Sequence, residues 1–337
     1  MSTWTDAFCG AGGSSTGIEQ AGGHVIAAIN HWPTAVATHQ LNHPGTEHVC
    51  CDISQADPAR FPRTEFAWFS TSCTHHTNAQ GKRRHRSAFV PTLGSWDGVR
   101  DAEPDSARAT MFDVIRFSEH HRYQGVIVEN VPEVRDWQLF PWWVDMMTDG
   151  LGYDWRPVIL DSSLTADLGP AVPQSRRRLY MLFWRGGESP SAPSQQHDAP
   201  GADTILDDDP GPLIADRARP LAASTMARIE ATLDRYSDQR LIVSYYGASK
   251  VGRPASHPLG TLTTHDRHAL VTRGSDGIHY RMLNLAEQVR AMGFPDTYQW
   301  SGTRADITKQ IGNAVTPNCA RDISAALMTA AGRKEAA

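Results

Sequence analysis

The stretch Thr3–Gln20, TWTDAFCGAGGSSTGIEQ, decides the fold that the sequence predicts. It predicts a short strand over Thr3–Phe8, a glycine-rich turn over Cys9–Ser15, and a helix that ends near Gln20. A strand that turns through glycines into a helix N-terminus lets the backbone approach a cofactor closely. The spacing is GxGG and not GxGxxG, so a dinucleotide is not the first choice of ligand. The alternative is a tight strand-to-helix turn that binds no ligand.

Short apolar runs follow this stretch and predict further strands of one open α/β sheet, with helices between them. The predicted strands are His24–Asn30, His48–Ile53, Phe66–Phe69, Val126–Val128, Trp155–Leu160 and Leu179–Trp184. Asn30 and Asp52 stand at the carboxyl ends of two of these strands, where ligands bind in such sheets. Each is equally typical of a turn in which the side chain bonds its own backbone.

Apolar residues at helical spacing predict the helices. Met111, Val114 and Phe117 share one face of a helix that precedes the fifth strand. Trp142 and Trp143 belong to another predicted helix, and we expect both in the core rather than in a platform for stacking bases.

Cys73 is the candidate nucleophile, because it follows the buried strand Phe66–Phe69 and precedes a basic cluster. The cluster contains Lys82, Arg83, Arg84 and Arg86. A thiol at the end of a strand, beside a positively charged loop, suits a nucleophile that must meet a polyanion. Taken alone, a single cysteine is more often a small buried hydrophobic residue, and a cluster of cations is more often a solvated surface.

Three consecutive arginines, Arg176–Arg178, lead directly into the apolar strand Leu179–Trp184. Because arginine is almost never fully buried without a partner, we expect at least one of them to point into a site. Beyond this strand, Gly186–Asp203 is rich in Gly, Ser, Pro, Gln and Asp, which predicts a linker or a long surface loop.

Composition limits the possible classes of protein. The chain has 337 residues, enough for one large domain and a smaller one, and a net charge of −5. That charge excludes a histone-like polyelectrolyte but leaves room for a local basic cleft. We find no basic stretch followed by an apolar one at the start of the sequence, so we expect no secretion signal. No run of about 18 apolar residues occurs, so we expect no membrane span. Five cysteines without a spaced framework favour a reducing cytoplasm.

Six motifs, all in the order found in one family, resemble those of the DNA cytosine-C5 methyltransferases. They are DAFCGAGGSSTGIEQAG from Asp6, Cys73 itself, ENV from Glu129, QxRxR from Gln174, RMLNLAEQVRAMGFP from Arg281 and QIGNAVTP from Gln310. The resemblance covers nearly the whole chain except Gly186 to about Tyr280. The Cys-Thr-x-His pattern at Cys73 is similar to that of a divergent, phage-type branch.

The resemblance implies a Rossmann-like class I methyltransferase sheet with helices on both faces, formed by residues 1–185 and 281–337. It implies a smaller target-recognition domain inserted at 186–280. The implied reaction transfers a methyl group from S-adenosylmethionine to carbon 5 of a cytosine flipped out of DNA. Cys73 would attack carbon 6 of the ring, Glu129 would contact N3 and the exocyclic amine, and Arg176 and Arg178 would hold O2.

The resemblance also implies the binding residues. The expected contacts to S-adenosylmethionine come from Phe8, Gly10, Gly12, Asn30, Asp52, Ile53 and Asn313. The expected contacts to DNA phosphates come from Lys82, Arg83, Arg84 and Arg86.

The chain departs from the family pattern in two places. Ser72 and Thr74 flank Cys73 where the family has Pro and Gln, so the nucleophile is held differently. Asn30 stands where the family has an acid for the ribose hydroxyls, and it lacks charge assistance. His75 and His76 follow Cys73 as candidate proton acceptors or thiolate partners, or as donors to phosphate or loop backbone.

Several alternatives remain at this point. The substrate could be tRNA, or the chain could be an impaired DNA-binding paralogue. Amino-group methylation is disfavoured because the fourth strand ends in Thr-Ser-Cys. A metal site in His43, His48, Cys50 and Cys51, or in Cys73, His75 and His76, is disfavoured because no CxxC pair exists. We expect a cytoplasmic monomer that binds double-stranded DNA, with a cognate restriction endonuclease as a possible partner in the same system.

Overall fold

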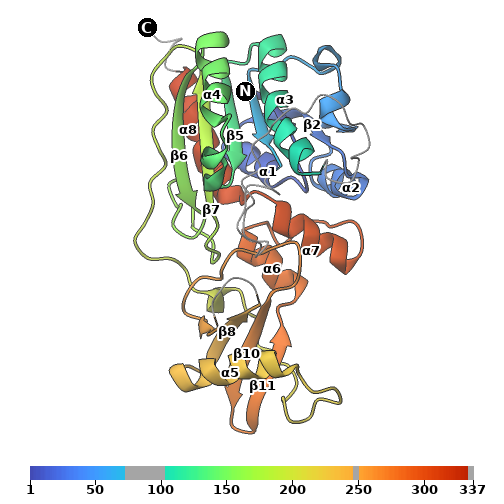
Figure 1. The fold of residues 1–337 in the computed structure, drawn as a ribbon, viewed down its shortest axis with the longest axis vertical. Coiled ribbons are helices and arrows are strands. Elements are labelled where there is room, and N and C mark those ends of the chain that lie inside the picture. The colour runs from blue at the N-terminus through green and yellow to red at the C-terminus, as the bar shows by residue number, and fades with distance from the viewer. Residues whose placement is uncertain (73–102, 246–249, 333–337) are drawn as a thin grey trace, which may run out of the picture.

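The computed structural model describes residues 1–72, 103–245 and 250–332, without the side chains of 103–108. A seven-stranded sheet forms the larger part of the molecule, and a four-stranded sheet forms the smaller part below it (Figure 1). The helices α6 and α7 lie between the two parts (Figure 1).

The large sheet has the strand order β3-β2-β1-β4-β5-β7-β6. Its strands are β1 (Thr3–Ala7), β2 (His24–Asn30), β3 (Glu47–Cys50), β4 (Phe66–Ser70), β5 (Gly125–Asn130), β6 (Asp154–Asp161) and β7 (Arg177–Trp184). Strand β7 runs antiparallel to both of its neighbours, and the β3-β2-β1-β4-β5 pairs are all parallel. The carboxyl ends of β1 to β5 therefore meet at one edge of the sheet.

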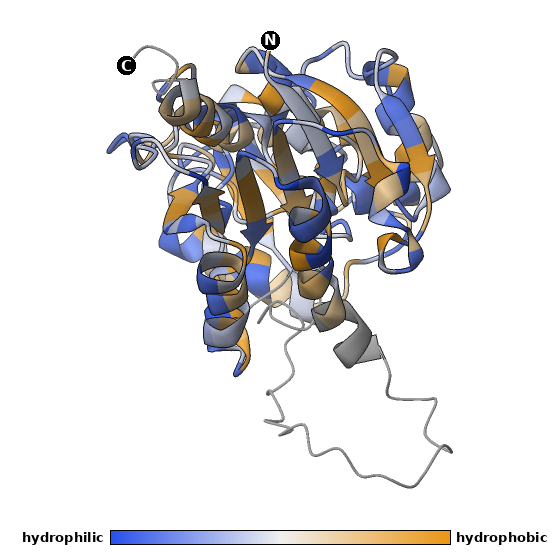
Figure 2. Cartoon of the chain, turned by 90° about the horizontal axis from the view of Figure 1, so that it is seen from above, coloured by the Kyte–Doolittle hydropathy of each residue, from blue (hydrophilic) through white to orange (hydrophobic). Residues whose placement is uncertain are grey.

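Helices cover both faces of this sheet. They are α1 (Gly13–Gln20), α2 (Pro33–Asn42), α3 (Glu103–His121), α4 (Phe140–Asp145) and α8 (Pro317–Gly332). Alternate residues of β4 show the two sides: Phe66 and Trp68 pack with α1 and α8, whereas Ala67 and Phe69 pack with α3 and α4. Viewed from above, hydrophobic residues lie along the strands between the flanking helices (Figure 2).

The small sheet is antiparallel, with the order β11-β10-β8-β9. Its elements are β8 (Arg240–Ser244), β9 (Arg253–Pro254), β10 (His268–Gly274) and β11 (Gly277–Met282), with α5 (Ala223–Arg235), α6 (Leu285–Met292) and α7 (Arg304–Asn313). Leu241 and Val243 pack against Ile229 of α5, and Ile242 packs in the cluster that contains Ile311 of α7. Both of its faces are therefore covered, one of them by the helices that lead back to the large sheet.

Short helices complete the chain. They are the 3₁₀ helices η1 (Ile53–Gln55), η2 (Pro58–Arg60), η4 (Pro132–Asp136) and η6 (Ala202–Thr204), and the π-helical turn η5 (Met146–Gly150).

The predicted open sheet with helices on both faces is confirmed, and two details are wrong. The third strand ends at Cys50, because the Asp52 side chain accepts a hydrogen bond from the Ser54 amide and starts η1. Trp143 is fully buried as expected, but Trp142 is 67% exposed. Neighbouring residues of a helix face different directions, so a pair of tryptophans does not enter the core together. The division of the chain at residues 186 and 280 stays a prediction.

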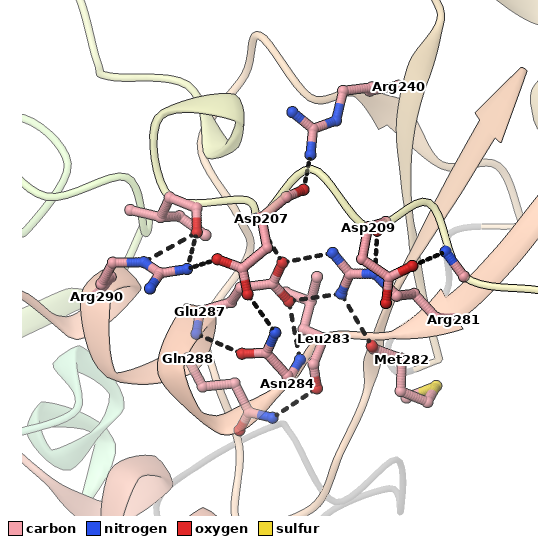
Figure 3. A network of polar contacts seen from close by, with 12 residues as sticks. Asp207, Asp209, Arg240, Arg281, Met282, Leu283, Asn284, Glu287, Gln288 and Arg290 are labelled. Atoms are coloured by element: carbon pink, nitrogen blue, oxygen red, sulfur yellow. Dashed lines mark hydrogen bonds and ion pairs between the residues drawn. The ribbon is translucent and has the colours of Figure 1, made fainter. Parts of the chain in front are cut away.

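A buried ion pair joins the segment around Asp207 to the start of α6 (Figure 3). The Glu287 side chain is fully buried, and its two oxygens accept hydrogen bonds of 2.6 and 2.7 Å from Arg281. The same carboxylate accepts the backbone amides of Asp207 and Asn284 at 2.9 and 2.8 Å. Asn284 donates in turn to the Asp207 carboxylate at 2.6 Å. Four donors on one buried carboxylate make this junction depend on the charge of Glu287.

We expect Glu287→Gln to lower the free energy of unfolding by about 3–5 kcal/mol, because it leaves the Arg281 guanidinium without its carboxylate. Asp276→Asn is the matched control: this carboxylate also pairs with a basic side chain, His279, but it is 60% exposed. Because exposed pairs contribute little to stability, Asp276→Asn should leave the free energy of unfolding nearly unchanged. Urea denaturation of both variants measures the difference, and equal small losses would contradict the assigned role of Glu287.

Candidate active site and cofactor site

The glycine-rich loop after β1 has an unusual backbone. Phe8, Gly10 and Gly12 have φ of 59°, 53° and 96°, all in the left-handed region. For a non-glycine residue such as Phe8 this conformation costs about 1–3 kcal/mol, and strain of this kind gathers at ligand sites. The loop lies at the carboxyl edge of the sheet, where ligands of open α/β sheets bind.

One side of this loop is packed and the other is open. A Cβ at Gly12 would lie 2.6 Å from the Tyr298 hydroxyl, and a Cβ at Gly13 would lie 2.0 Å from the carbonyl oxygen of Val315. A Cβ at Gly10 would meet no atom of the described chain within 4 Å. Glycine is therefore required at positions 12 and 13 by the segments behind the loop. The side that carries Gly10 has room for a ligand.

The other predicted cofactor residues stand near the same edge. The Asn30 side-chain oxygen accepts the Trp32 amide at 2.9 Å, so it makes the local turn as well as standing at the end of β2. Asp52 is exposed and caps η1, whereas Ile53 is buried in the core under the sheet. Asn313 is exposed at the last position of α7. Their roles toward the cofactor stay predictions.

Glu129 and Arg178 form an ion pair at this edge. The Arg178 Nε lies 3.2 Å from the Glu129 Oε1, and the side chains are only 13% and 10% exposed. Burial raises the pKa of Glu129 above its usual range, although Arg178 and then Arg176 favour the ionised form. A carboxyl group held this way retains a proton more readily than one in water. It can act as a hydrogen-bond donor beside a fixed positive charge.

The chain that leads to Cys73 leaves the sheet beside Glu129. Ser70, the last residue of β4, pairs with Glu129 of β5. The next residue, Thr71, accepts a 2.9 Å hydrogen bond from Asn130. The first described segment, residues 1–72, therefore stops close to the Glu129–Arg178 ion pair. Cys73, His75, His76, Lys82, Arg83, Arg84 and Arg86 lie outside the described residues.

Arg176 joins separate segments behind the ion pair. Its Nη1 and Nη2 donate to the carbonyl oxygens of Leu262 and Gly312 at 3.2 and 3.0 Å. Gln174, two residues earlier, accepts the Leu262 amide at 2.7 Å. Of the three consecutive arginines, Arg178 lies against Glu129 and Arg177 is exposed. The expectation that at least one of these arginines points into a site stays a prediction.

Sequence reasoning missed several residues that shape the site. Leu262 belongs to none of the six motifs, yet two of the three QxRxR side chains, Gln174 and Arg176, bond to its backbone. Tyr298 donates to the carbonyl of Ala11 in the glycine-rich loop at 2.5 Å. No spacing signal links position 298 to position 11, because contacts between distant segments leave no periodicity in one sequence.

Two further properties concern the described residues alone. Within 1–72, 103–245 and 250–332, no group of three or more His, Cys, Asp or Glu side chains is arranged to hold a metal ion. Over the same residues, no helix is long and apolar enough to cross a membrane.

Comparison with known families matches residues 2–329 to C-5 cytosine-specific DNA methylases. The chain is 27% identical over 322 residues to the type II methyltransferase M.HgiDI of Herpetosiphon aurantiacus, which covers 94% of this chain and 90% of that protein. It is 24% identical over 349 residues to the type II methyltransferase M.NgoPII of Neisseria gonorrhoeae, covering 95% and 93%.

Solved structures give the same fold. A putative DNA modification methyltransferase from an Escherichia coli prophage superposes with a TM-score of 0.66 at 17% identity, covering 98% of this chain and all of that one. The Dnmt2 methyltransferase of Schizosaccharomyces pombe gives 0.65 at 16% identity, covering 98% and 99%. The predicted Rossmann-like methyltransferase fold is confirmed.

We expect Gly13→Ala to weaken binding of S-adenosylmethionine by tenfold or more. The new Cβ would lie 2.0 Å from the Val315 carbonyl, so the loop or the 314–316 segment must move. Even a displacement of about 1 Å in such a site can lower the rate of a catalysed reaction about 100-fold. Gly45→Ala is the control, since no atom of the described residues lies within 4 Å of a Cβ built there. Calorimetric titration of both folded variants with S-adenosylmethionine measures their affinities. An unchanged affinity in Gly13→Ala would contradict the packing described.

Proposed function

We propose, from the premise that the chain belongs to the C-5 cytosine-specific DNA methylase family, that it methylates carbon 5 of a flipped cytosine in DNA through a covalent Cys73 adduct. The methyl donor is S-adenosylmethionine, the cofactor of this family. The observation that carries the mechanism is the buried Glu129–Arg178 pair, which stands where the chain leaves β4 toward Cys73.

The glycine-rich loop fits the cofactor. Its left-handed backbone and the free space on the Gly10 side suit a ligand that lies against main-chain atoms. Phe8, Gly10, Gly12, Asn30 and Asp52 would hold the cofactor there, with Ile53 and Asn313 beside it. When bound, the cofactor supplies the methyl group that carbon 5 accepts.

The protein's own groups prepare the cytosine. The Cys73 thiolate adds to carbon 6, and the electrons move through the ring to N3 and O2. Glu129 donates a proton or a hydrogen bond at N3, and the Arg178 guanidinium stabilises the charge that develops on O2. After carbon 5 has gained its methyl group, a base removes the carbon 5 proton and the electrons of that bond expel Cys73. Arg176 is the second candidate for holding O2, and its Nη1 and Nη2 also donate to the carbonyl oxygens of Leu262 and Gly312.

Two finer assignments complete the proposal. Residues 186–280 form the target-recognition domain, and Lys82, Arg83, Arg84 and Arg86 contact DNA phosphates. The relatives M.HgiDI and M.NgoPII carry the name of type II methyltransferases, which supports duplex DNA as substrate and a cognate restriction endonuclease as partner.

Incubation with tritiated S-adenosylmethionine and either duplex DNA or tRNA tests the substrate. We expect label in DNA, on 5-methylcytosine after digestion, and none in tRNA. Label in tRNA alone would replace this function with the RNA reaction. A folded protein that binds cofactor and labels neither would identify a DNA-binding paralogue.

We expect Glu129→Gln to lower the single-turnover rate by about 10²–10⁴-fold, the usual contribution of a positioned proton donor. Since burial raises the pKa of Glu129, the donor form is lost as pH rises through that value, and the wild-type rate falls there. The variant should lack this decline. Glu133→Gln, four residues along in η4, should behave as wild type. An unchanged rate or an unchanged pH profile in Glu129→Gln would exclude the donor role.

A further inference from the structure

Two histidines of the α2 segment lie behind the glycine-rich loop, away from the proposed reaction. His39 is fully buried and His43 is 5% exposed. Neither belongs to a motif that carried the functional assignment. Buried imidazoles in a polar network require an explanation, because each ring nitrogen needs a partner.

A chain of hydrogen bonds connects His39 to the start of α1. The His39 Nε2 lies 2.9 Å from the Ser15 hydroxyl, and that hydroxyl donates to the Asp6 carboxylate at 2.6 Å. Ser14 donates to the same carboxylate oxygen at 2.6 Å. On its other side, the His39 Nδ1 lies 2.8 Å from the His48 Nε2.

The direction of these bonds follows from counting protons. Ser15 has one hydroxyl proton and gives it to Asp6, so the Nε2–H of His39 must donate to Ser15. Burial, and then His43 and His48, lower the pKa of His39, so the ring is neutral and its Nδ1 accepts a hydrogen bond from the Nε2–H of His48. Burial raises the pKa of Asp6 to about 6, so the carboxylate is ionised at pH 7.5 and accepts both serines. Each donor in the chain therefore points toward Asp6.

This chain anchors the first turn of α1 through its side chains. The N-cap position of α1 is Gly12, which has no side chain to bond the first turn. Ser14 and Ser15 of that turn are instead bound to Asp6 in β1, and His39 fixes the Ser15 hydroxyl. The first turn follows directly from the loop that carries Phe8 and Gly10. Its position therefore sets the position of the loop.

A second histidine supports the same loop from the side. His43 contacts Glu19 at 2.9 Å and Thr16 at 3.3 Å, both in α1. It also lies 3.4 Å from the hydroxyl of Tyr298, which bonds the loop carbonyl of Ala11. These contacts reach the loop from its packed side, and not from the open side at Gly10.

We propose that His39 is a positioning residue for the cofactor: through Ser15 and Asp6 it holds the glycine-rich loop in the shape that binds S-adenosylmethionine. The inference rests on the proposed function, since the loop must be the cofactor site. His39 touches neither the cofactor nor the base. Its loss should therefore affect cofactor affinity and leave DNA binding and the rate at saturating cofactor near their wild-type values.

Calorimetric titration of the full chain with S-adenosylmethionine tests this in four variants. His39→Leu removes both hydrogen bonds and Ser15→Ala removes the link to Asp6, and each should raise the Kd at least tenfold. His39→Gln retains an amide donor near the Nε2 position and should stay within threefold of wild type. His24→Leu, at the opposite end of β2, is the control and should have no effect.

The outcomes separate the possible failures. Wild-type affinity in Ser15→Ala overturns the inference even where His39→Leu does not fold. Equal losses in His39→Leu and His39→Gln, or a parallel loss of DNA binding, would indicate a packing role and also overturn it. A wild-type chain that binds no S-adenosylmethionine would instead overturn the proposed function on which the inference rests.

Discussion

The close approach of the chain's C-terminal segment to its first helix is the constraint on which the site depends. The Val315 carbonyl occupies the space where any side chain at position 13 would begin, and Tyr298 does the same at position 12. The segment that follows, α8, then packs with α1 on one face of the large sheet. A backbone contact this tight admits only glycine, so two motifs about 300 residues apart must be correct together. The glycine-rich loop is thus shaped from behind by Tyr298 and by the segment around Val315.

The electrostatics of the site divide into two buried groups with different tasks. Glu129 faces Arg178 of β7 at the edge where the chain leaves toward Cys73, and burial lets this carboxyl group hold a proton more readily than it would in water. Asp6 faces two serines behind the loop, and the hydrogen bonds it accepts from them hold α1 in place. Burial raises the pKa of both carboxyl groups. What differs is the partner, a guanidinium in one case and hydroxyl groups in the other.

Local sequence signals predicted the sheet well, and they indicated a candidate site at its carboxyl edge. Apolar runs located the strands, because a strand covered on both faces must be apolar at consecutive positions. The ENV and QxRxR motifs located Glu129 and Arg178 before their contact was known. The exit from β3 was wrong by a few residues, because the Asp52 turn competes with strand pairing. The exposure of Trp142 depends on which face of α4 it occupies.

Contacts between distant segments could not be predicted from the sequence. Nothing at Leu262 indicates that Gln174 and Arg176 bond to its backbone, and nothing at His39 indicates a link to Asp6. These bonds join segments that are far apart in the chain, and a single sequence records no trace of which residues meet. The residues found by motif are those that we propose to face a substrate. The residues found only in the structure are those that hold the motif residues in place.

The central claim is that a sulfur at position 73 bonds carbon 6 of cytosine beside Glu129 and Arg178. A duplex in which every cytosine is 5-fluorocytosine tests it directly, because fluorine at carbon 5 prevents the final elimination and preserves the adduct. After incubation with S-adenosylmethionine and digestion, mass spectrometry should find the nucleotide attached to Cys73. An adduct on another residue, or none from folded protein that binds the cofactor, would contradict the account.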